Sequence, residues 1–304
     1  MHKIILTGAT SYTGKAICKH LLDNGNIVYA VTRKDSQRTQ SLLAHPNLKI
    51  LYADISNYSQ LLKQIDNADA FIHHAWAGVK SDWNNPEIHE QNIKGSQDAL
   101  EVAKRLNCKA FLQAGSQAEY GNTDGSLITE EHICNPTTEY GKAKLKTALN
   151  GLEKVGQLKF AHYRIFSIYG HGDHSYTMIA TALEKMRKNE TVELATDGTQ
   201  LWNYLLVDDF GEKVGLLAEA MLNSSTANEY GIFNMASDDT RPLKSYMEEM
   251  KTALNSKSPL LFGDQKSAIQ LNPSIEKLKQ YIRNPAFTPF AEGIVAMNLR
   301  MEQR

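Results

Sequence analysis

The feature that most constrains the fold is a glycine-rich turn close to the start of the chain. Residues 4–6 form a continuous apolar run, as in a strand that is covered on both faces. Gly8 and Gly14 lie at the two ends of the turn that follows, and from Ala16 onward the apolar residues recur at helical spacing. A strand that turns sharply into a helix directs several free N–H groups at one point, and that point suits a diphosphate.

Composition excludes several classes of protein. The chain has 304 residues, enough for one large domain or two fused lobes, and its formal net charge of −1 gives no indication of nucleic acid or a membrane as partner. No apolar run approaches membrane-spanning length, and the chain enters a strand at once, so we expect no signal peptide. Cys18, Cys108 and Cys134 lack the spacing of a metal site or a disulfide framework, which predicts free thiols in a reducing cytoplasm.

Adjacent histidines at 73 and 74 invite a metal interpretation, but we expect no metal site. They lie in an expected strand over residues 70–78, and neighbouring residues on a strand point to opposite faces. We therefore expect His73 and His74 to be packing residues. Further strands are expected over residues 26–32, 48–53, 109–115, 160–166 and 230–236, and further helices over 58–65, 92–105, 175–188 and 210–222.

Ser116, Tyr140 and Lys144 form the candidate catalytic group. Tyr140 and Lys144 are four residues apart, so they share one face of a helix. The pKa of a free tyrosine is about 10, and a nearby ammonium, together with the positive charge of an oxidised nicotinamide, would lower it. Hydride transfer to a ketone leaves negative charge on its oxygen, and a proton must arrive there. Ser116 would donate a hydrogen bond to that ketone oxygen and fix its position. The alternative is a buried tyrosine beside a lysine whose stem packs on an amphipathic helix.

Several motifs together carry a resemblance to a known family. The chain contains a TGxxSxxG turn at 7–14, SQAEYG at 116–121, YGKAK at 140–144, RIFSIYG at 164–170 and DGTQLWNYLLVDD at 197–209. With these motifs it resembles the extended short-chain dehydrogenase/reductase superfamily, and within it the NAD-dependent epimerase/dehydratase family, whose members modify nucleotide sugars. The resemblance covers essentially the whole chain. Ser11 replaces the middle glycine of the family's turn, but its hydroxyl can itself donate to a phosphate.

The resemblance implies an α/β fold, with a doubly wound parallel sheet of the NAD(P)-binding Rossmann type and a smaller C-terminal substrate lobe. The dinucleotide-binding domain would comprise residues 1–166, with 201–236 returning to it, and the lobe would comprise 167–200 and 237–304. A homodimer is implied through the two long helices that follow Asn92 and surround Tyr140.

The resemblance also implies the site residues. The catalytic residues would be Ser116, Tyr140 and Lys144. The cofactor-binding residues would be Gly8, Thr10, Ser11, Tyr12, Thr13, Gly14, Arg33, Lys34, Asp54, Ile55, His74, Ala75, Tyr140, Lys144 and Ile165. The substrate would contact Trp76, Ser116, Gln117, Ser167 and Trp202. Asp54 could equally cap the helix that follows it, and Asn92 could either bridge backbone near the active centre or simply begin its helix.

The end of the second strand indicates which cofactor is bound. In this fold an acidic residue there binds the ribose 2′-hydroxyl of NAD. The sequence instead has Thr32, Arg33 and Lys34, and two cations without a carboxylate favour NADP, with NAD as the alternative. Arg33 and Lys34 could also be solvated loop charges.

Departures from the family pattern narrow the reaction. Gln117 and Ala118 stand where 4,6-dehydratases carry an Asp-Glu pair, so dehydration is disfavoured. Gln117 and Gly172 stand near where 3,5-epimerase/reductases use Cys and His. Trp202 replaces the Arg that would contact a nucleotide diphosphate. Either Trp202 stacks on a base or ring instead, or Arg164, Arg187 or Arg241 supplies the charge.

Plain redox chemistry remains. We predict an NAD(P)-dependent oxidoreductase that reduces a keto group of a nucleotide-linked deoxysugar. A nucleotide-sugar C4 epimerase with tightly bound NAD is the first alternative. A reductase of carbonyls other than sugars and a non-catalytic NADP-sensing binding protein are the others.

Overall fold

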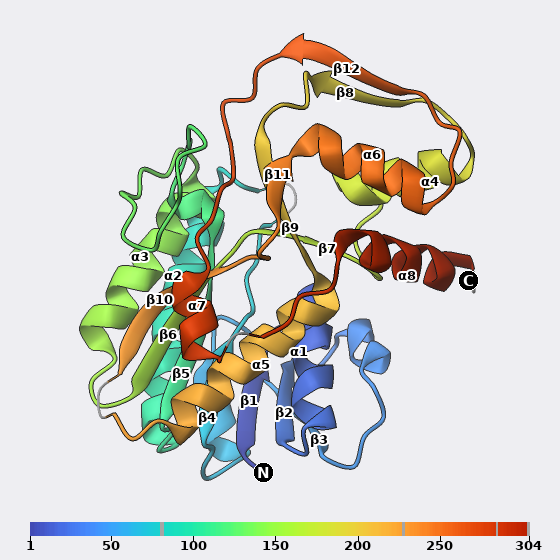
Figure 1. Cartoon of the computed structure of the whole chain (residues 1–304). Helices are drawn as coiled ribbons and strands as arrows, with labels where there is room; N and C mark the ends of the chain where they lie inside the picture. Colours follow the sequence, from blue (N-terminus) through green and yellow to red (C-terminus); the bar gives the residue numbers. More distant parts are fainter. Residues whose placement is uncertain (80–81, 227–228, 284, 303–304) are drawn as a thin grey trace.

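A seven-stranded parallel sheet forms the centre of the molecule. The computed structural model describes residues 1–79, 82–226, 229–283 and 285–302 (Figure 1). The strands run in the order β10-β6-β5-β4-β1-β2-β3, and each neighbouring pair is parallel. They are β1 (Lys3–Thr7), β2 (Ile27–Thr32), β3 (Leu48–Tyr52), β4 (Ala70–His73), β5 (Ala110–Ser116), β6 (Lys159–Ile165) and β10 (Tyr230–Met235). The predicted doubly wound α/β sheet is confirmed.

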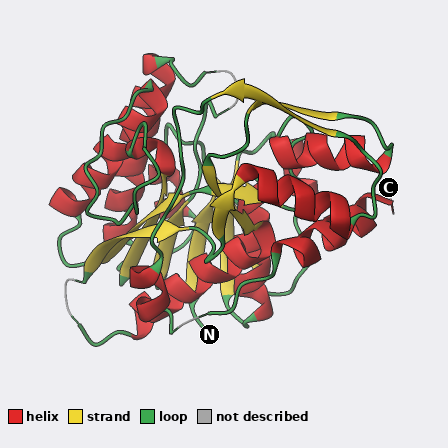
Figure 2. Ribbon diagram, turned by 45° about the horizontal axis from the view of Figure 1, so that its top comes forward, coloured by secondary structure: helices red, strands yellow, loops and turns green. Residues whose placement is uncertain are grey.

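Helices cover both faces of this sheet (Figure 2). On one face α1 (Tyr12–Asp23) packs against α5 (Val207–Asn223), and on the other α2 (Pro86–Arg105) packs against α3 (Glu139–Lys154). Alternate residues of β1 enter the two cores: Ile4 and Leu6 join the cluster under α1 and α5, and Ile5 joins the cluster under α2. This burial on both faces explains why the strand is apolar without alternation.

A second, smaller body lies beyond the carboxyl ends of the large sheet, at the top of Figure 1. It contains the three-stranded sheet β11-β9-β7 and the parallel pair β12-β8. Its strands are β7 (Ser167–Tyr169), β8 (Val192–Thr196), β9 (Leu201–Leu206), β11 (Thr240–Pro242) and β12 (Leu260–Gln265). Its helices are α4 (Met178–Arg187), α6 (Leu243–Ala253) and α8 (Phe290–Glu302), while α7 (Glu276–Tyr281) packs against β10. Residues 201–206, which we expected to return to the large domain, form β9 and pair within this smaller body. The chain then returns to the large sheet with α5 and β10. The division into two domains stays a prediction.

Several elements begin at other residues than the sequence pattern predicted. The helix expected over 92–105 starts at Pro86, because the Asn85 side chain accepts hydrogen bonds from the amides of Glu87 and Ile88 and caps it. Asn92 therefore lies inside α2, where its side chain bonds both the N–H and the C=O of Ala77, so it bridges backbone and does not begin the helix.

Other bounds differ by a few residues. The segment expected as a helix over 58–65 is the short 3₁₀ helix η2 (Tyr58–Lys63), and the strand expected over 70–78 ends at His73. Two more 3₁₀ turns are η1 (Gln37–Ser41) and η3 (Gln117–Glu119). None of the described helices combines the length and the apolar character needed to cross a membrane.

Candidate active site

The glycine-rich turn between β1 and α1 is as tight as the sequence predicted. Gly8 has a φ of +72°, and a Cβ at this position would lie 2.9 Å from the amide nitrogen of Ala75. A Cβ on Gly14 would lie 2.1 Å from the carbonyl oxygen of Gly8. Both positions thus require glycine, because the start of α1 passes directly over the end of β1.

Ser11 caps the helix that the turn opens. Its Oγ accepts a hydrogen bond from the amide of Gly14 at 3.0 Å, so this amide is already used. The amides of Tyr12 and Thr13 have no hydrogen-bond partner among the residues that the structure describes, and the buried hydroxyl of Tyr12 has none either. Free donors at the positive end of a helix suit a phosphate group, and Thr10 lies partly buried beside them.

His73 and His74 turn to opposite faces of β4, as expected. His73 Nε2 lies 3.1 Å from Ser96 Oγ on α2, whereas His74 contacts Thr13 Oγ1 on α1 at 2.7 Å and the Tyr163 hydroxyl on β6 at 2.9 Å. Burial lowers the pKa of both imidazoles to about 3, so both are neutral. His74 thereby holds the first turn of α1 against the sheet.

The end of β2 carries the cations predicted for a ribose phosphate. Arg33 and Lys34 are exposed, and neither forms an ion pair within the described ranges. Thr32 is buried, with its Oγ1 unpartnered. At the end of β3, Asp54 accepts two hydrogen bonds from Ser56, which forms an Asx turn, so Asp54 does not cap η2. The neighbouring Ile55 packs on Gly95 of α2.

The three predicted catalytic side chains come together where β5 meets α3. Ser116 is the last residue of β5, and its side chain is close enough to Tyr140 to lower the pKa of that hydroxyl. Thr138 caps α3 by accepting a hydrogen bond from the amide of Gly141, which fixes the helical turn that carries Tyr140. One turn further, the buried Lys144 donates from Nζ to the carbonyl oxygen of Ala114 at 2.7 Å.

Burial has the largest effect on the pKa values of Tyr140 and Lys144. Burial raises the pKa of Tyr140 to about 12, with the Ser116 hydrogen bond acting in the opposite direction. Burial also lowers the pKa of Lys144 to about 7. The prediction that the ammonium and an oxidised nicotinamide together lower the tyrosine pKa concerns the coenzyme-bound site, and it stays a prediction. The Lys144 Nζ lies 3.7 Å from the centre of the Trp76 indole and 5.8 Å from that of the Tyr140 ring.

Aromatic rings surround Tyr140 on the other side. The rings of Trp76, Trp83 and His89 lie 6.0, 4.5 and 5.8 Å from it, centre to centre. The backbone carbonyl of Trp83 also accepts a hydrogen bond from the Tyr140 amide at 2.9 Å. The sequence analysis identified Trp76 but missed Trp83 and His89. The available signal was that two of the chain's three tryptophans lie within eight residues, directly after β4.

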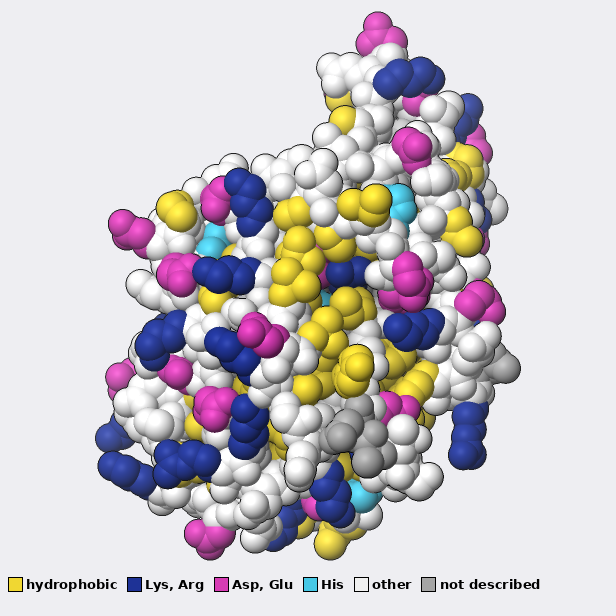
Figure 3. All heavy atoms as spheres, turned by 90° about the vertical axis from the view of Figure 1, so that its left-hand side faces the viewer, with side chains coloured by type: hydrophobic (Ala, Val, Ile, Leu, Met, Phe, Trp, Pro, Cys, Tyr) yellow, Lys and Arg dark blue, Asp and Glu magenta, His cyan; other side chains and the backbone are white. Residues whose placement is uncertain are grey.

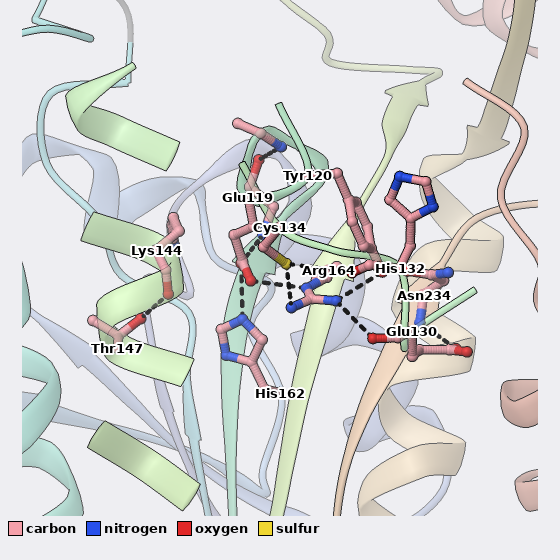
Figure 4. A network of polar contacts seen from close by, with 12 residues as sticks. Glu119, Tyr120, Glu130, His132, Cys134, Lys144, Thr147, His162, Arg164 and Asn234 are labelled. Carbon is pink, nitrogen blue, oxygen red and sulfur yellow. Dashed lines mark hydrogen bonds and ion pairs between the residues drawn. The ribbon is translucent and has the colours of Figure 1, made fainter. Parts of the chain in front are cut away.

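A buried ionic cluster behind Ser116 was also missed. The Glu119 carboxylate contacts His162 Nε2 and Arg164 Nε, each at 2.8 Å (Figure 4). Arg164 is only 2% exposed, so it cannot supply the charge for a substrate diphosphate as we had considered. Arg241 forms ion pairs with Asp239 and Glu249.

The remaining predicted residues lie around this centre or on the lobe side of it. Ile165 is paired with Ser116 across β6 and β5, and Ser167 begins β7 two residues later. Gln117 has a buried Oε1 without a hydrogen-bond partner among the described residues. Trp202 lies on β9 opposite Arg241 of β11 and packs against both the lobe core and the cluster that contains Tyr120. Arg187 is exposed at the end of α4.

Comparisons with known proteins agree with this architecture. The model of the family described as "NAD dependent epimerase/dehydratase family" matches residues 4–248. The chain is 28% identical over 252 residues to dTDP-6-deoxy-L-talose 4-dehydrogenase (NAD(+)) of Aggregatibacter actinomycetemcomitans, covering 81% of this chain and 88% of the relative. It is 22% identical over 271 residues to CDP-abequose synthase of Salmonella muenchen, covering 86% and 84%.

Solved structures share the whole fold. The UDP-N-acetylglucosamine 4-epimerase from Bacillus cereus superposes with a TM-score of 0.83 at 18% identity, covering 100% of this chain and 98% of that one. The UDP-glucuronic acid 4-epimerase from Bacillus cereus, in complex with UDP-glucuronic acid and NAD, superposes with a TM-score of 0.81 at 20% identity, covering 99% of each chain. At these identities the likeness concerns the fold alone.

Proposed function

The chain belongs to the NAD dependent epimerase/dehydratase family and is an enzyme of it, and from this premise we propose that it reduces a keto group of a nucleotide-linked deoxysugar, at C4 of the sugar. The observation that carries the proposal is the buried group of Ser116, Tyr140 and Lys144 at the carboxyl end of β5. The relative named as a dTDP-6-deoxy-L-talose 4-dehydrogenase supports both the deoxysugar and the C4 position.

The residues of the site fit a nicotinamide coenzyme. The unpartnered amides of Tyr12 and Thr13 would bind its diphosphate, and Gly8 leaves room for the close approach. When bound, the coenzyme supplies the hydride. Ser116 would then donate a hydrogen bond to the substrate carbonyl oxygen, and Tyr140 would transfer its proton to that oxygen, so that the ketone becomes an alcohol.

Two features bear on the choice of reaction. Gln117 and Ala118 offer neither the acid nor the base that dehydration needs. A C4 epimerase remains the alternative, because the structures that share the fold include 4-epimerases. An epimerase would purify with bound NAD and need none added, whereas a reductase would consume its coenzyme stoichiometrically.

Arg33 and Lys34 support NADP as the preferred coenzyme, with NAD as the alternative that the relatives' names favour. The variants Arg33→Ala and Lys34→Ala should each weaken binding of NADPH by about tenfold, because each removes a charge-assisted contact to the 2′-phosphate. Binding of NADH should stay within twofold. Equal losses for both coenzymes would contradict the NADP preference. Fluorescence titration of the bound nicotinamide measures both.

We also propose a homodimer through α2 and α3, located in the cytoplasm. Figure 3 shows that hydrophobic side chains gather in the middle of the face on which α3 lies in Figure 1. Leu149 on α3 is 57% exposed, and an apolar patch on this face suits contact with a second copy. The three unpaired thiols support a reducing compartment. Light scattering of the wild type and Leu149→Lys tests the dimer.

The test of the function is a turnover assay. The purified protein is incubated with NADPH or NADH and a panel of dTDP-, CDP- and UDP-linked 4-keto-6-deoxyhexoses, and absorbance at 340 nm is followed, with products identified by mass spectrometry. We expect turnover that Tyr140→Phe abolishes. Interconversion of C4 epimers without net coenzyme use would favour the epimerase. Turnover of simple ketones alone would favour a carbonyl reductase. A wild type that binds the coenzyme but turns over none of the panel, with coenzyme binding unchanged in Tyr140→Phe, would favour a sensor.

A further inference from the structure

Glu119 lies directly behind the catalytic serine and makes more contacts there than a packing residue would. It is wholly buried. Its Oε1 accepts from the Ser116 amide at 2.8 Å and from His162 Nε2 at 2.8 Å, and its Oε2 accepts from Arg164 Nε at 2.8 Å. Figure 4 shows Glu119, from η3, between His162 and Arg164, which both come from β6.

The contact with Ser116 belongs to a capping box. Glu119 accepts from the Ser116 amide, and the Ser116 Oγ in turn accepts from the amide of Ala118 at 3.1 Å. These reciprocal bonds fix both the backbone and the side-chain rotamer of Ser116. The Ala118 amide occupies one acceptor site of the Oγ and leaves its hydroxyl proton free to donate, and Ser116 lowers the pKa of the neighbouring Tyr140.

The cluster on the far side of Glu119 prevents the carboxylate from moving. His162 is held between two side chains: its Nδ1 lies 2.9 Å from Gln113 Nε2, and its Nε2 lies 2.8 Å from Glu119 Oε1. Gly115 leaves the space for this contact, since a Cβ there would lie 2.2 Å from His162 Nε2 and 2.7 Å from Glu119 Oε1.

Arg164 has one charged partner in the described part of the chain, and it is Glu119. Its other contacts are neutral: Nη1 donates to the Tyr120 hydroxyl at 2.8 Å and to the Glu130 carbonyl at 3.2 Å, and Nη2 lies 3.1 Å from Cys134 Sγ. A buried ion pair is a poor device for stability, because desolvation offsets most of the attraction. Its place behind Ser116 therefore calls for a role in orienting that residue.

We propose that Glu119 is a positioning residue of the reaction: held by His162 and Arg164, its carboxylate fixes Ser116 so that the serine hydroxyl donates to the reacting oxygen beside Tyr140. This inference rests on the proposed carbonyl reduction. Glu119 touches neither substrate nor coenzyme in this role, and it acts only through Ser116.

The test is a double-mutant cycle on turnover. Glu119→Gln places an amide N–H₂ against the Arg164 donor, so we expect kcat to fall at least tenfold while KM and the coenzyme Kd stay within twofold. In a Ser116→Ala background the same change should have no further effect, because the group on which Glu119 acts is gone. Additive losses in the cycle, or an unchanged kcat in Glu119→Gln, would overturn the proposal.

Two further variants protect the cycle against a folding defect. Glu119→Asp keeps the counter-charge of Arg164 but withdraws the carboxylate from the Ser116 amide, so it should lose kcat in the same cycle. Cys134→Ala removes a different neighbour of Arg164 and leaves the capping box intact, so its kcat should equal that of the wild type.

A readout without substrate separates this proposal from the proposed function. Hydrogen exchange of the Ser116 amide, measured by NMR on the whole chain, should speed up at least tenfold in Glu119→Asp and stay unchanged in Cys134→Ala. Unchanged exchange in Glu119→Asp overturns the positioning role, whatever the substrate. Faster exchange in a protein that turns over none of the panel keeps the contact and refutes the carbonyl reduction.

Discussion

Tyr140 lies between two groups of side chains of opposite character. On one side is an aromatic wall, formed by Trp76, Trp83 and His89. On the other is an ionic wall, formed by Ser116, Glu119, His162 and Arg164. The aromatic wall packs rings around Tyr140, whereas the ionic wall offers hydrogen-bonding groups and the ion pair of Glu119 with Arg164.

The difference shows which effect dominates the site. Burial moves both side chains toward their neutral forms, raising the pKa of Tyr140 to about 12 and lowering that of Lys144 to about 7. The Glu119 carboxylate raises the pKa of both groups, so it favours the phenol and the ammonium. Desolvation therefore changes both pKa values more than the Glu119 charge of the ionic wall does.

The largest expected effect comes from removing the Tyr140 hydroxyl. Tyr140→Phe should lower kcat by about 10²- to 10⁴-fold, the usual contribution of a general acid. The ring stays, so the contacts with Trp76 and Trp83 persist and the protein should fold as before. Steady-state kinetics and circular dichroism check this. Tyr29→Phe on β2, a tyrosine outside the site, is the matched control and should keep full turnover. A kcat within threefold of the wild type in Tyr140→Phe would refute the role.

The second largest effect is a pH dependence of stability, which comes from the buried Lys144 beside the aromatic wall. The pKa of Lys144 is about 7 in the folded chain against an ordinary value of 10.5. Between these pH values the unfolded chain binds one more proton, so the free energy of unfolding should rise with pH, by up to about 1.4 kcal/mol per unit. Urea denaturation at pH 7, 8 and 9 should show this rise in the wild type and a flatter profile in Lys144→Met.

The control is Lys142→Met, on the same helix. Its ammonium is exposed and pairs with Glu139, so its removal should leave the slope of the wild type. Identical slopes in the wild type and in Lys144→Met would mean that burial does not lower the lysine pKa.

The third effect disturbs the ionic wall alone. In Gly115→Ala the new methyl group would meet His162 Nε2 and Glu119 Oε1, both buried and hydrogen-bonded, so we expect a loss of about 1–3 kcal/mol in the free energy of unfolding. Gly231→Ala on β10 is the matched control, because its Cβ would meet the Phe233 ring at 3.0 Å and the flexible Lys277 side chain at 3.7 Å. Equal losses in both variants would show that the ionic wall can adapt as easily as a packed ring.

The two walls also differ in how far the sequence predicted them. Ser116, Tyr140 and Lys144 were predictable because their roles depend on local spacing at the end of one strand and along one helix. Trp83 and His89 were not, since a loop after β4 and the early start of α2 bring them to Tyr140. That early start had a signal, Asn85 followed by a proline, which is a helix N-terminus.

The ionic wall had a weaker signal. His162 and Arg164 alternate with apolar residues on β6, so they share one side of a buried strand, but only the pairing with β5 shows that Glu119 faces them. The effect of burial on the tyrosine pKa could not be predicted for a similar reason. The four-residue spacing places Lys144 on the same helix face as Tyr140, yet it says nothing of how deeply the pair is buried or of Trp76 beside the ammonium.

The smallest expected effect concerns the face of the Trp76 indole, which lies against the Lys144 ammonium. The Lys144 Nζ lies 3.7 Å from the centre of the Trp76 indole, a geometry that stabilises the ammonium by up to about 2 kcal/mol when buried. Trp76→Leu should therefore lower the pKa of Lys144 further, by up to about 1.5 units, and Trp76→Phe by less. The pKa is read from the lysine ¹³Cε resonance that disappears in Lys144→Met.

Trp83→Leu separates the π face from simple burial. Its ring packs against Tyr140 at 4.5 Å but does not lie over the Lys144 ammonium, so its removal should leave the Lys144 titration unchanged. A fall of similar size in the Lys144 pKa in Trp83→Leu and Trp76→Leu would mean that the aromatic rings act together and not through the Trp76 face. A rise in Trp76→Leu would mean that water enters and that exclusion of solvent, rather than the indole face, controls the charge of Lys144.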